Sequence, residues 1–212
     1  DADARHGVLF SEIACAVTLM QLLHLVCVSL TPYPRAEAAK LWRNDPKFVG
    51  RIGVVVPCHR SEAEIGNTVQ SLLAAGIRPE HVCVVDNANL PESPDDTRGA
   101  VARAGAGRCQ YVYVPVGLKT NALWVGARAL PEAVEYVVHI DDDTVLPADM
   151  VWDEAHFADE RTSAVSYGIQ MGRTGDVESL VDFEFALWSH WRIFRARFST
   201  AWFCHGIIGL WR

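Results

Sequence analysis

After residue 51, short apolar runs alternate regularly with longer helix-like stretches, and this alternation limits the folds open to the chain. The β-branched runs and the helix-like stretches follow one another in the order 52–56, 62–75, 82–85, 111–114, 120–129 and 136–140. Such alternation is typical of βαβ units, in which helices cover both faces of a sheet. The pattern predicts an α/β fold with a mostly parallel sheet, whose ligands bind beyond the carboxyl ends of the strands.

The composition excludes two other classes of protein. The 212 residues include 19 Lys and Arg against 26 Asp and Glu, which gives a formal net charge of -7. An acidic chain of this kind is not a strongly basic nucleic-acid binder, so we predict no nucleic-acid partner. Half of the residues are hydrophobic, which is ample for a core and excludes a disordered chain.

The cysteines are scattered along the chain. They show no Cys-x-x-Cys pair and no metal-ligand spacing, at positions 15, 27, 58, 83, 109 and 204. Most of them lie in apolar runs. We therefore predict reduced core cysteines facing the cytosol rather than a disulfide framework.

A long apolar segment precedes the α/β pattern. Residues 8–30 are long enough to cross a hydrocarbon core of ~30 Å, with Glu12 near the interface. Basic residues are concentrated just after the segment, and this bias places the rest of the chain in the cytosol. We predict a transmembrane helix within 1–34, a linker over 35–50 and a globular domain over 51–212, on a membrane. A long buried or amphipathic helix is the alternative for residues 8–30.

Polar residues follow the first two predicted strands. The first strand runs into Pro57, and the second ends at Asp86 and Asn87. A carboxylate at a strand end can accept hydrogen bonds from a nucleobase N–H or a ribose hydroxyl. An Asp followed by Asn is also a common turn former. Both interpretations of Asp86 remain open at this point.

Three consecutive aspartates follow the apolar run 136–140. Clustered carboxylates raise one another's pKa unless a cation neutralises them. In an extended segment Asp141 and Asp143 would point to the same side, and Asp142 would face away. Two such carboxylates suit Mg²⁺ or Mn²⁺, which commonly keeps substrate phosphates in its remaining positions. The segment therefore predicts a metal and phosphate site at Asp141 and Asp143, with a solvated acidic turn as the alternative.

Four segments in this order resemble the family 2 inverting glycosyltransferases with a GT-A fold, of the membrane polysaccharide synthase type. That type includes the cellulose, chitin and hyaluronan synthases. The matching segments are the first βα unit from Pro57, the strand end at Asp86, the G-x-K-x-x-A-L segment over 117–123 and the D-x-D-T motif over 141–144.

The resemblance implies an enzyme that transfers a hexose from a UDP-sugar donor, with inversion and with Mg²⁺ or Mn²⁺, to a growing polysaccharide or another glycan acceptor. It places Asp86 at the uracil or ribose, Asp141 at the nucleotide and the metal, and Asp143 at the metal as the direct ligand. Pro57 is a further donor-binding candidate, and Lys119 could supply positive charge near the phosphates.

The first motif departs from the family's usual Asn-Glu pair, which is replaced here by Arg60 and Ser61. Glu62 is the candidate substitute for the missing glutamate, and we count it among the donor-binding candidates.

The end of the chain leaves the catalytic base open. Residues 205–212 resemble the small-residue segment that lines the acceptor site in these synthases, and His205 is a candidate base by its pKa class. Its position before Gly206 favours a structural role instead. The chain begins without Met and stops at Arg212, before the acidic pair and the Q-x-x-R-W motif of the family. We expect a fragment whose base lies beyond Arg212 and which, alone, is an inactive nucleotide-sugar-binding module.

A different enzyme class uses the same aspartates. Asp141 and Asp143 after an apolar strand also match the motif of haloacid-dehalogenase-type phosphatases, in which the first Asp is the phosphoryl nucleophile and the second the acid/base. That family needs a downstream acidic metal motif, and here Asp176 and Asp182 are wrongly spaced for it. The phosphatase is therefore the alternative function.

Overall fold

The computed structural model describes residues 15, 18–20, 22–23, 26, 44–167 and 208–212. The chain divides into two compact units, one of residues 1–36 with 168–203 and one of residues 37–167 with 204–212. In the first unit, the described residues between 15 and 26 are helical and exposed. The second unit contains the sheet.

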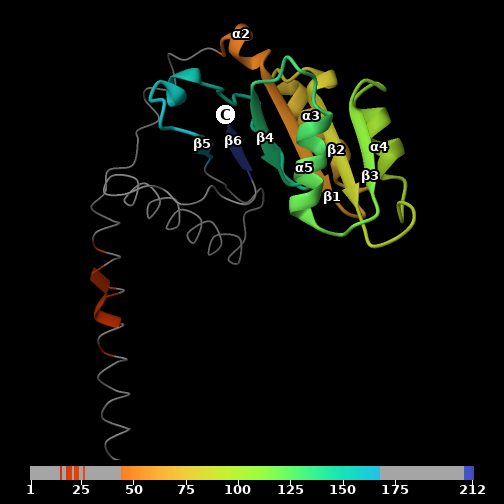
Figure 1. The fold of residues 1–212 in the computed structure, drawn as a ribbon, viewed down its shortest axis with the longest axis horizontal. Coiled ribbons are helices and arrows are strands. Elements are labelled where there is room, and N and C mark those ends of the chain that lie inside the picture. The colour runs from red at the N-terminus through yellow and green to blue at the C-terminus, as the bar shows by residue number, and fades with distance from the viewer. Residues whose placement is uncertain (1–14, 16–17, 21, 24–25, 27–43, 168–207) are drawn as a thin grey trace, which may run out of the picture. The chain divides into compact units, whose positions relative to one another are not determined.

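A six-stranded sheet forms the centre of this second unit (Figure 1). Its strands are β1 (Ile52–Cys58), β2 (Val82–Asn87), β3 (Gln110–Val114), β4 (Tyr136–Ile140), β5 (Ala164–Ser166) and β6 (Ile208–Trp211). They lie side by side in the order β3-β2-β1-β4-β6-β5. The first four strands pair in parallel, and β6 is antiparallel to both β4 and β5. The predicted α/β class with a mostly parallel sheet is confirmed.

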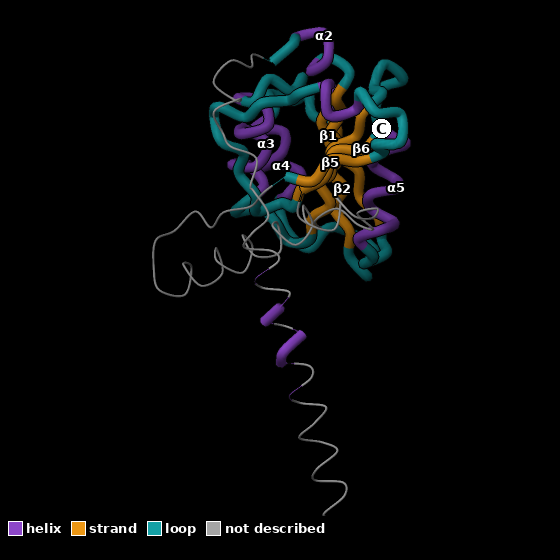
Figure 2. The backbone as a smooth tube through the Cα atoms, turned by 90° about the vertical axis from the view of Figure 1, so that its left-hand side faces the viewer, coloured by secondary structure: helices purple, strands orange, loops and turns teal. Residues whose placement is uncertain are grey.

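Helices cover both faces of the sheet (Figure 2). They are α2 (Pro46–Val49), α3 (Ile65–Ala74), α4 (Thr97–Ala104) and α5 (Lys119–Ala129), with 3-10 turns at Pro79–His81 and Glu154–Phe157. Helices α3 and α4 lie on one face, and α5 lies on the other. The sequence patterns did not predict α4, which begins where the Asp96 side chain accepts a hydrogen bond from the Gly99 N–H at 3.1 Å.

The two central strands are buried along their whole length. Every residue of β1 and β2 is buried, as expected for parallel strands covered on both faces. Helix α5 packs closely on them, because a Cβ at Gly126 would lie 2.3 Å from Val55 Cγ1 and 2.9 Å from Val85 Cγ2. Glycine at position 126 therefore permits the close packing of α5 on the sheet.

The end of the segment predicted as a linker forms helix α2, which is part of the packed structure of this unit. Phe48 of α2 is completely buried, and its ring meets Tyr136 edge-on at 5.0 Å. The neighbouring Arg51 pairs with Glu135 at 2.8 Å and with Glu154 at 2.5 Å.

The last strand joins the sheet from far along the chain. Residues of β6 pair with β4, and Trp211 Nε1 donates a hydrogen bond to His139 Nδ1 at 2.9 Å. The described part of the segment 205–212, expected at the acceptor site, is therefore a strand of the central sheet.

Two predictions concern parts of the chain that are largely outside the described residues. Most of the apolar segment 8–30 lies there, and among the described residues no helix has the length and apolar character needed to cross a membrane. Cys27 and Cys204 also lie there, while Cys15, Cys58, Cys83 and Cys109 are free thiols.

Candidate functional site

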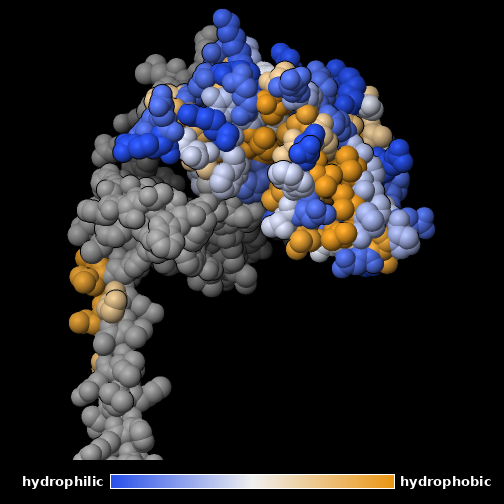
Figure 3. All heavy atoms as spheres, viewed as in Figure 1, coloured by the Kyte–Doolittle hydropathy of each residue, from blue (hydrophilic) through white to orange (hydrophobic). Residues whose placement is uncertain are grey.

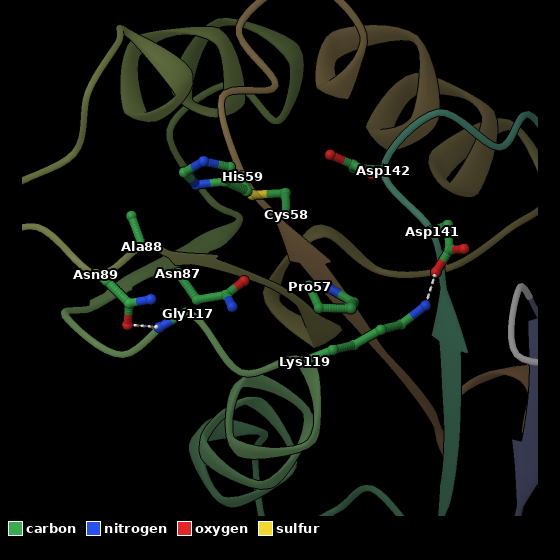
Figure 4. Close-up of a pocket in the computed structure, with 10 residues that line it drawn as sticks. All are labelled: Pro57, Cys58, His59, Asn87, Ala88, Asn89, Gly117, Lys119, Asp141 and Asp142. Carbon is green, nitrogen blue, oxygen red and sulfur yellow. Dashed lines mark hydrogen bonds and ion pairs between the residues drawn. The ribbon is translucent and has the colours of Figure 1, made fainter.

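A pocket of about 510 Å³ lies beyond the carboxyl ends of β1, β2 and β4 (Figure 4). Strand β1 lies between β2 and β4, so the pocket occupies the place where the strand order reverses, which is the usual ligand crevice of such sheets. The residues that line it are Pro57, Cys58, His59, Asn87, Ala88, Asn89, Gly117, Lys119, Asp141 and Asp142.

The end of β1 supplies one wall of the pocket. Beyond Cys58 and His59 the chain turns at Arg60, which adopts a positive φ of 56°. Burial raises the pKa of the Cys58 thiol far above its usual range, and the charges of Asp86 and Asp142 raise it further. The thiol therefore faces the pocket in its protonated form.

Asp86, near the end of β2, is completely buried. Its Oδ2 accepts hydrogen bonds from Ser93 Oγ at 2.5 Å and from the Tyr111 hydroxyl at 2.8 Å. Its Oδ1 is buried and has no hydrogen-bond partner in the described part of the chain. Asp86 does not line the pocket in this structure, whereas the next two residues, Asn87 and Ala88, do.

Asn87 ties three elements together beside the pocket. In the orientation that satisfies both halves of its amide, the Asn87 side chain donates to the Cys58 carbonyl at 2.8 Å and accepts from the Leu118 N–H at 3.1 Å. The ends of β1 and β2 are thereby linked to the residue that precedes α5. From the sequence, Asn87 was predicted as part of a turn or of the strand-end motif, with no contact of its own.

The loop before α5 closes the pocket from the other side. Asn89 Oδ1 accepts a hydrogen bond from the Gly117 N–H at 2.8 Å, and a Cβ at Gly117 would lie 2.9 Å from Asn89 Nδ2. Glycine therefore permits this close approach. Helix α5 then starts at Lys119 with no hydrogen bond from the side chain of its N-cap, Leu118. The partial positive charge of a helix N-terminus lies at the pocket, where it favours an anion.

Exposed apolar side chains adjoin the pocket on this side. Val116 and Leu118, on either side of Gly117, are both about half exposed. Trp124 of α5 is 62% exposed, and the Arg128 guanidinium lies 5.4 Å from the centre of its ring. Figure 3 shows an apolar area, in orange, over the face that carries α5.

Lys119 and Asp141 face each other in the pocket and form an ion pair between the Lys119 Nζ and Asp141 Oδ1 atoms (Figure 4). The lysine comes from the first residue of α5, and the aspartate directly follows β4. The two side chains are 48% and 24% exposed. A cationic and an anionic group are thus both accessible in the same pocket.

The acidic segment after β4 is a turn rather than an extended strand. Strand β4 ends at Ile140, and the Thr144 N–H donates to the Asp141 carbonyl at 3.2 Å. The predicted arrangement, with Asp141 and Asp143 on one side and Asp142 facing away, is therefore wrong. Among the described residues, Asp141 and Asp142 line the pocket, while Asp143 is exposed outside its lining.

Buried hydroxyl groups at and near α3 hold this turn in place. Ser61 Oγ donates to the Asp142 carboxylate, and Thr68 Oγ1 donates to the Asp142 carbonyl at 2.6 Å. Ser71 Oγ accepts from the Leu146 N–H at 3.0 Å. These contacts explain why Asp142, rather than Asp143, is drawn to the inner side of the turn.

Glu62 lies in a separate network. Its carboxylate accepts from the Asp96 N–H at 3.2 Å, and its own N–H donates to Asp95 Oδ2 at 3.2 Å. Burial alone would raise the pKa of Asp95, but hydrogen bonds from Thr97 and from the Glu62 backbone lower it below its ordinary value. Glu62 thus joins the start of α3 to the loop before α4.

The structure brings together some of the predicted site residues and not others. The predicted residues that line the pocket are Pro57, Lys119 and Asp141. The described residues that were predicted but lie outside its lining are Glu62, Asp86 and Asp143. His205, the candidate base, lies outside the described residues. The lining residues that were not predicted as ligand contacts are Cys58, His59, Asn87, Ala88, Asn89, Gly117 and Asp142.

The donor set suits a cation that is shared with a ligand. Asp141 and Asp142 present carboxylates at the pocket, and Asp143 follows them in the turn but lies outside the lining. In the described ranges no group of three or more His, Cys, Asp and Glu side chains could hold a metal ion. Mg²⁺ is commonly bound by one or two carboxylates together with substrate phosphates. The residues present therefore fit a divalent cation that takes its remaining ligands from phosphate oxygens.

A family model described as Glycosyl transferase family 2 matches residues 53–211, well over half of the chain. The chain belongs to this family. The fold of this family 2 member, a six-stranded and mostly parallel sheet with helices on both faces, fits the GT-A class. The family assignment leaves the phosphatase alternative without support. No curated protein matches the chain.

Solved structures of two transferases resemble this family 2 member. The mannosyltransferase PcManGT from Pyrobaculum calidifontis, in complex with GDP-Man and Mn²⁺, matches with a TM-score of 0.54 and 21% identity, over 93% of this chain and 55% of that one. The glucosyl-3-phosphoglycerate synthase from Mycobacterium tuberculosis, in complex with Mg²⁺ and UDP, matches with a TM-score of 0.36 and 27% identity, over 56% and 41%. The chain thus spans about half the length of these proteins or less, and the first likeness supports the fold.

Proposed function

We propose that this chain binds the nucleoside diphosphate of a sugar donor in the pocket at the strand ends, as the donor-binding part of a metal-assisted glycosyltransferase. The observation that carries the proposal is the meeting of Lys119, the start of α5 and the acidic turn in one pocket. An ammonium group and a helix N-terminus suit a diphosphate, and the carboxylates suit its cation. The pocket volume of about 510 Å³ is in the range of small-molecule sites.

We further propose UDP as the nucleotide and a hexose as the transferred sugar, on the strength of the four motifs. The polar side chains that line this side of the pocket are His59, Asn87 and Asn89. Asp86 supports this wall from beneath, since it directly precedes Asn87 and Ala88. The motifs propose Asp86 as the contact for the uracil or ribose, and that contact would require its buried carboxylate to become accessible to the pocket.

The proposed reaction is an inverting transfer to a growing polysaccharide or another glycan. The acceptor hydroxyl attacks the anomeric carbon, a base takes its proton, and the bond from that carbon to the diphosphate breaks. A bound Mg²⁺ or Mn²⁺ would supply charge neutralisation for the departing diphosphate. Asp141 lines the pocket and is proposed to hold that ion; the motif adds Asp143, which lies outside the lining, and Lys119 is proposed to contact the phosphates. The base is not assigned: His205 is one candidate, but its position before Gly206 favours a structural role, and the family's acidic pair is the other.

Calorimetry of the whole chain with UDP tests the nucleotide site. We expect UDP to bind more tightly with Mn²⁺ than with EDTA, and Asp141→Asn to remove the difference. Asp159→Asn is the matched control, because Asp159 is exposed and pairs only with Arg161 in the described structure. Equal UDP affinity with and without metal would contradict the metal-assisted site. Binding of GDP in preference to UDP would contradict the choice of nucleotide.

We also propose that residues 8–30 anchor the chain in a membrane, with the glycosyltransferase domain facing the cytosol. The support is the apolar length of the segment and the basic residues that follow it. A glycan acceptor site introduced before Val8 should be modified in cells if that end lies outside the cytosol. An unmodified site would count against the anchor, provided that a secreted control protein carrying the same acceptor site is modified in the same cells.

A further inference from the structure

The ion pair between Lys119 and Asp141 gives the pocket a cation that belongs to the protein. We propose that Lys119 and a divalent metal ion are alternative partners of Asp141, and that a nucleoside diphosphate allows both to bind by drawing the lysine onto its phosphates. Metal and nucleotide would then bind together, and the metal alone would bind weakly. This inference rests on the proposed function, because it concerns the same pocket.

The pair is placed so that it can exchange. Both side chains are accessible, at 48% and 24% exposure, and they come from different elements, α5 and the end of β4. Ion pairs with this much solvent access contribute little to stability. Separating Lys119 from Asp141 therefore needs no unfolding and no rearrangement of the sheet.

The backbone on both sides of the pair is fixed, which leaves the lysine side chain as the moving part. Helix α5 packs closely on Val55 and Val85 at Gly126, and this packing opposes a shift of the helix along the sheet. On the other side, Thr68 Oγ1 holds the carbonyl of Asp142 at 2.6 Å. The ammonium of a lysine sits on a flexible four-carbon stem and can move between nearby anions.

Among the aspartates of the turn, Asp141 is the one available for exchange. The Asp142 carboxylate accepts a hydrogen bond from the buried Ser61, and Asp143 lies outside the pocket lining. The Asp141 carboxylate, which a metal ion in the pocket would bind, is therefore already paired with the ammonium group of Lys119. A metal ion that approached Asp141 would also be repelled by the ammonium group.

A diphosphate removes this conflict. Its oxygens can accept hydrogen bonds from Lys119 and from the N-terminal N–H groups of α5 while they also bind a metal ion. The lysine then keeps an anionic partner, and the Asp141 carboxylate becomes free for the metal. Metal and nucleotide should therefore bind with positive cooperativity. Each ligand should raise the affinity of the chain for the other by the same factor.

The test is a titration of the whole chain with Mn²⁺, without nucleotide, followed by the EPR signal of free Mn²⁺. We expect Lys119→Gln to bind Mn²⁺ about fivefold more tightly than the unchanged chain, the factor that follows from an exposed ion pair. Lys119→Arg keeps the charge and should bind Mn²⁺ as weakly as the unchanged chain. Lys47→Gln is the matched control, because Lys47 is exposed on α2 and outside the pocket lining.

A second titration, with UDP present, measures the coupling. In the unchanged chain UDP should tighten Mn²⁺ binding about tenfold or more, and in Lys119→Gln the factor should be smaller. Mn²⁺ affinity that stays the same or falls in Lys119→Gln overturns the inference. So does a gain in Lys119→Gln that persists when Asp141→Asn is added, because the ion would then bind elsewhere. Tighter Mn²⁺ binding in Lys119→Gln with no UDP binding at all would overturn the proposed function and leave the competition at Asp141 standing.

Discussion

Asp86 and Asp141 both lie where a strand of the sheet ends, and the sequence assigns both to the donor, yet their surroundings differ. Asp86 is 0% exposed and bonded to Ser93 and Tyr111, whereas the Asp141 side chain is 24% exposed and pairs with Lys119 inside the pocket. Strand β2 continues to Asn87, while β4 ends before Asp141. A carboxylate still within a strand is part of the core, and one just past it can reach a ligand.

The alternation of side chains in β2 accounts for the buried position of Asp86. Successive side chains of a strand point to opposite faces. Val85 contacts the α5 face at Gly126, and Asn87, two residues later, bonds to Leu118 just before α5. Asp86 lies between them and therefore points to the other face, where Ser93 and Tyr111 surround it. The pocket lining then includes Asn87 in place of Asp86.

The largest effect is expected from Asp86→Ala. The change removes two partly buried hydrogen bonds, leaves the Tyr111 hydroxyl without this acceptor and leaves Ser93 with only its longer bond to the Asp95 carbonyl, so we expect the free energy of unfolding to fall by about 3 kcal/mol. Urea denaturation followed by circular dichroism measures it. Asp86→Asn keeps an acceptor oxygen and should lose less. A loss below about 0.5 kcal/mol, typical of surface substitutions, would show that Asp86 is not a core residue.

The turn that carries Asp141 should depend on the buried hydroxyl of Thr68. Thr68→Val keeps the shape of the side chain but leaves the Asp142 carbonyl without its 2.6 Å hydrogen bond, and we expect a loss of about 1.5 kcal/mol. Thr120→Val, at an exposed position of α5, is the matched control and should change little. Equal stabilities of the two variants would contradict the anchoring of the turn by α3.

A smaller loss is expected from Tyr111→Phe. Asp86 would lose one of its two hydrogen-bond donors and keep the other, Ser93. We therefore expect the free energy of unfolding to fall by about 1 kcal/mol. Tyr113→Phe, two residues along β3, is the control. Its hydroxyl donates to the carbonyls of Leu90 and Glu92 in an exposed position where water can replace it. A larger loss for Tyr113→Phe than for Tyr111→Phe would contradict the core role given to Asp86.

The same tyrosine predicts a modest dependence of stability on alkaline pH. Burial, and then Asp86, raise the pKa of Tyr111 above its ordinary value near 10. Because the folded chain holds this proton more tightly than the unfolded chain, its contribution is complete below pH 10 and is lost as the pH rises further. Urea denaturation at pH 9 and at pH 10.5 should show a shallower decline for Tyr111→Phe than for the unchanged chain. Parallel declines would contradict the raised pKa.

The elements that could be predicted from the sequence are those whose pattern is local and continuous. The runs that form β1, β2 and β4 are apolar and β-branched, because both of their faces are covered. Helix α4 was missed since it is short and contains Gly99 among polar residues. Strand β6 was missed as a strand because its pairing with β4 joins residues about seventy positions apart, which no local pattern reveals.

The site was predictable where a motif names one residue at a strand end or at a helix start. Pro57, Lys119 and Asp141 were found, because each lies at a strand end or a helix start where the motif places it. Asn87 was missed because successive side chains of a strand point to opposite faces. A prediction that is wrong by one residue at the strand end therefore assigns Asp86 to the pocket and Asn87 to the core. Whether Asp142 or Asp143 lines the pocket depends on whether the chain is extended or turns after Ile140. Three consecutive aspartates do not reveal which of these two conformations the chain adopts.

The smallest effect on stability is expected at Asp141. Asp141→Ala removes only an ion pair with accessible partners, and we expect the free energy of unfolding to change by less than about 0.5 kcal/mol. Urea denaturation beside Asp86→Ala measures both on one scale. The two aspartates should then rank in opposite orders, with Asp86 dominating stability and Asp141 dominating metal-dependent binding of UDP. A loss for Asp141→Ala as large as that for Asp86→Ala would mean that the acidic turn is a structural element of the fold, and the pocket carboxylate would lose the freedom that both proposals require.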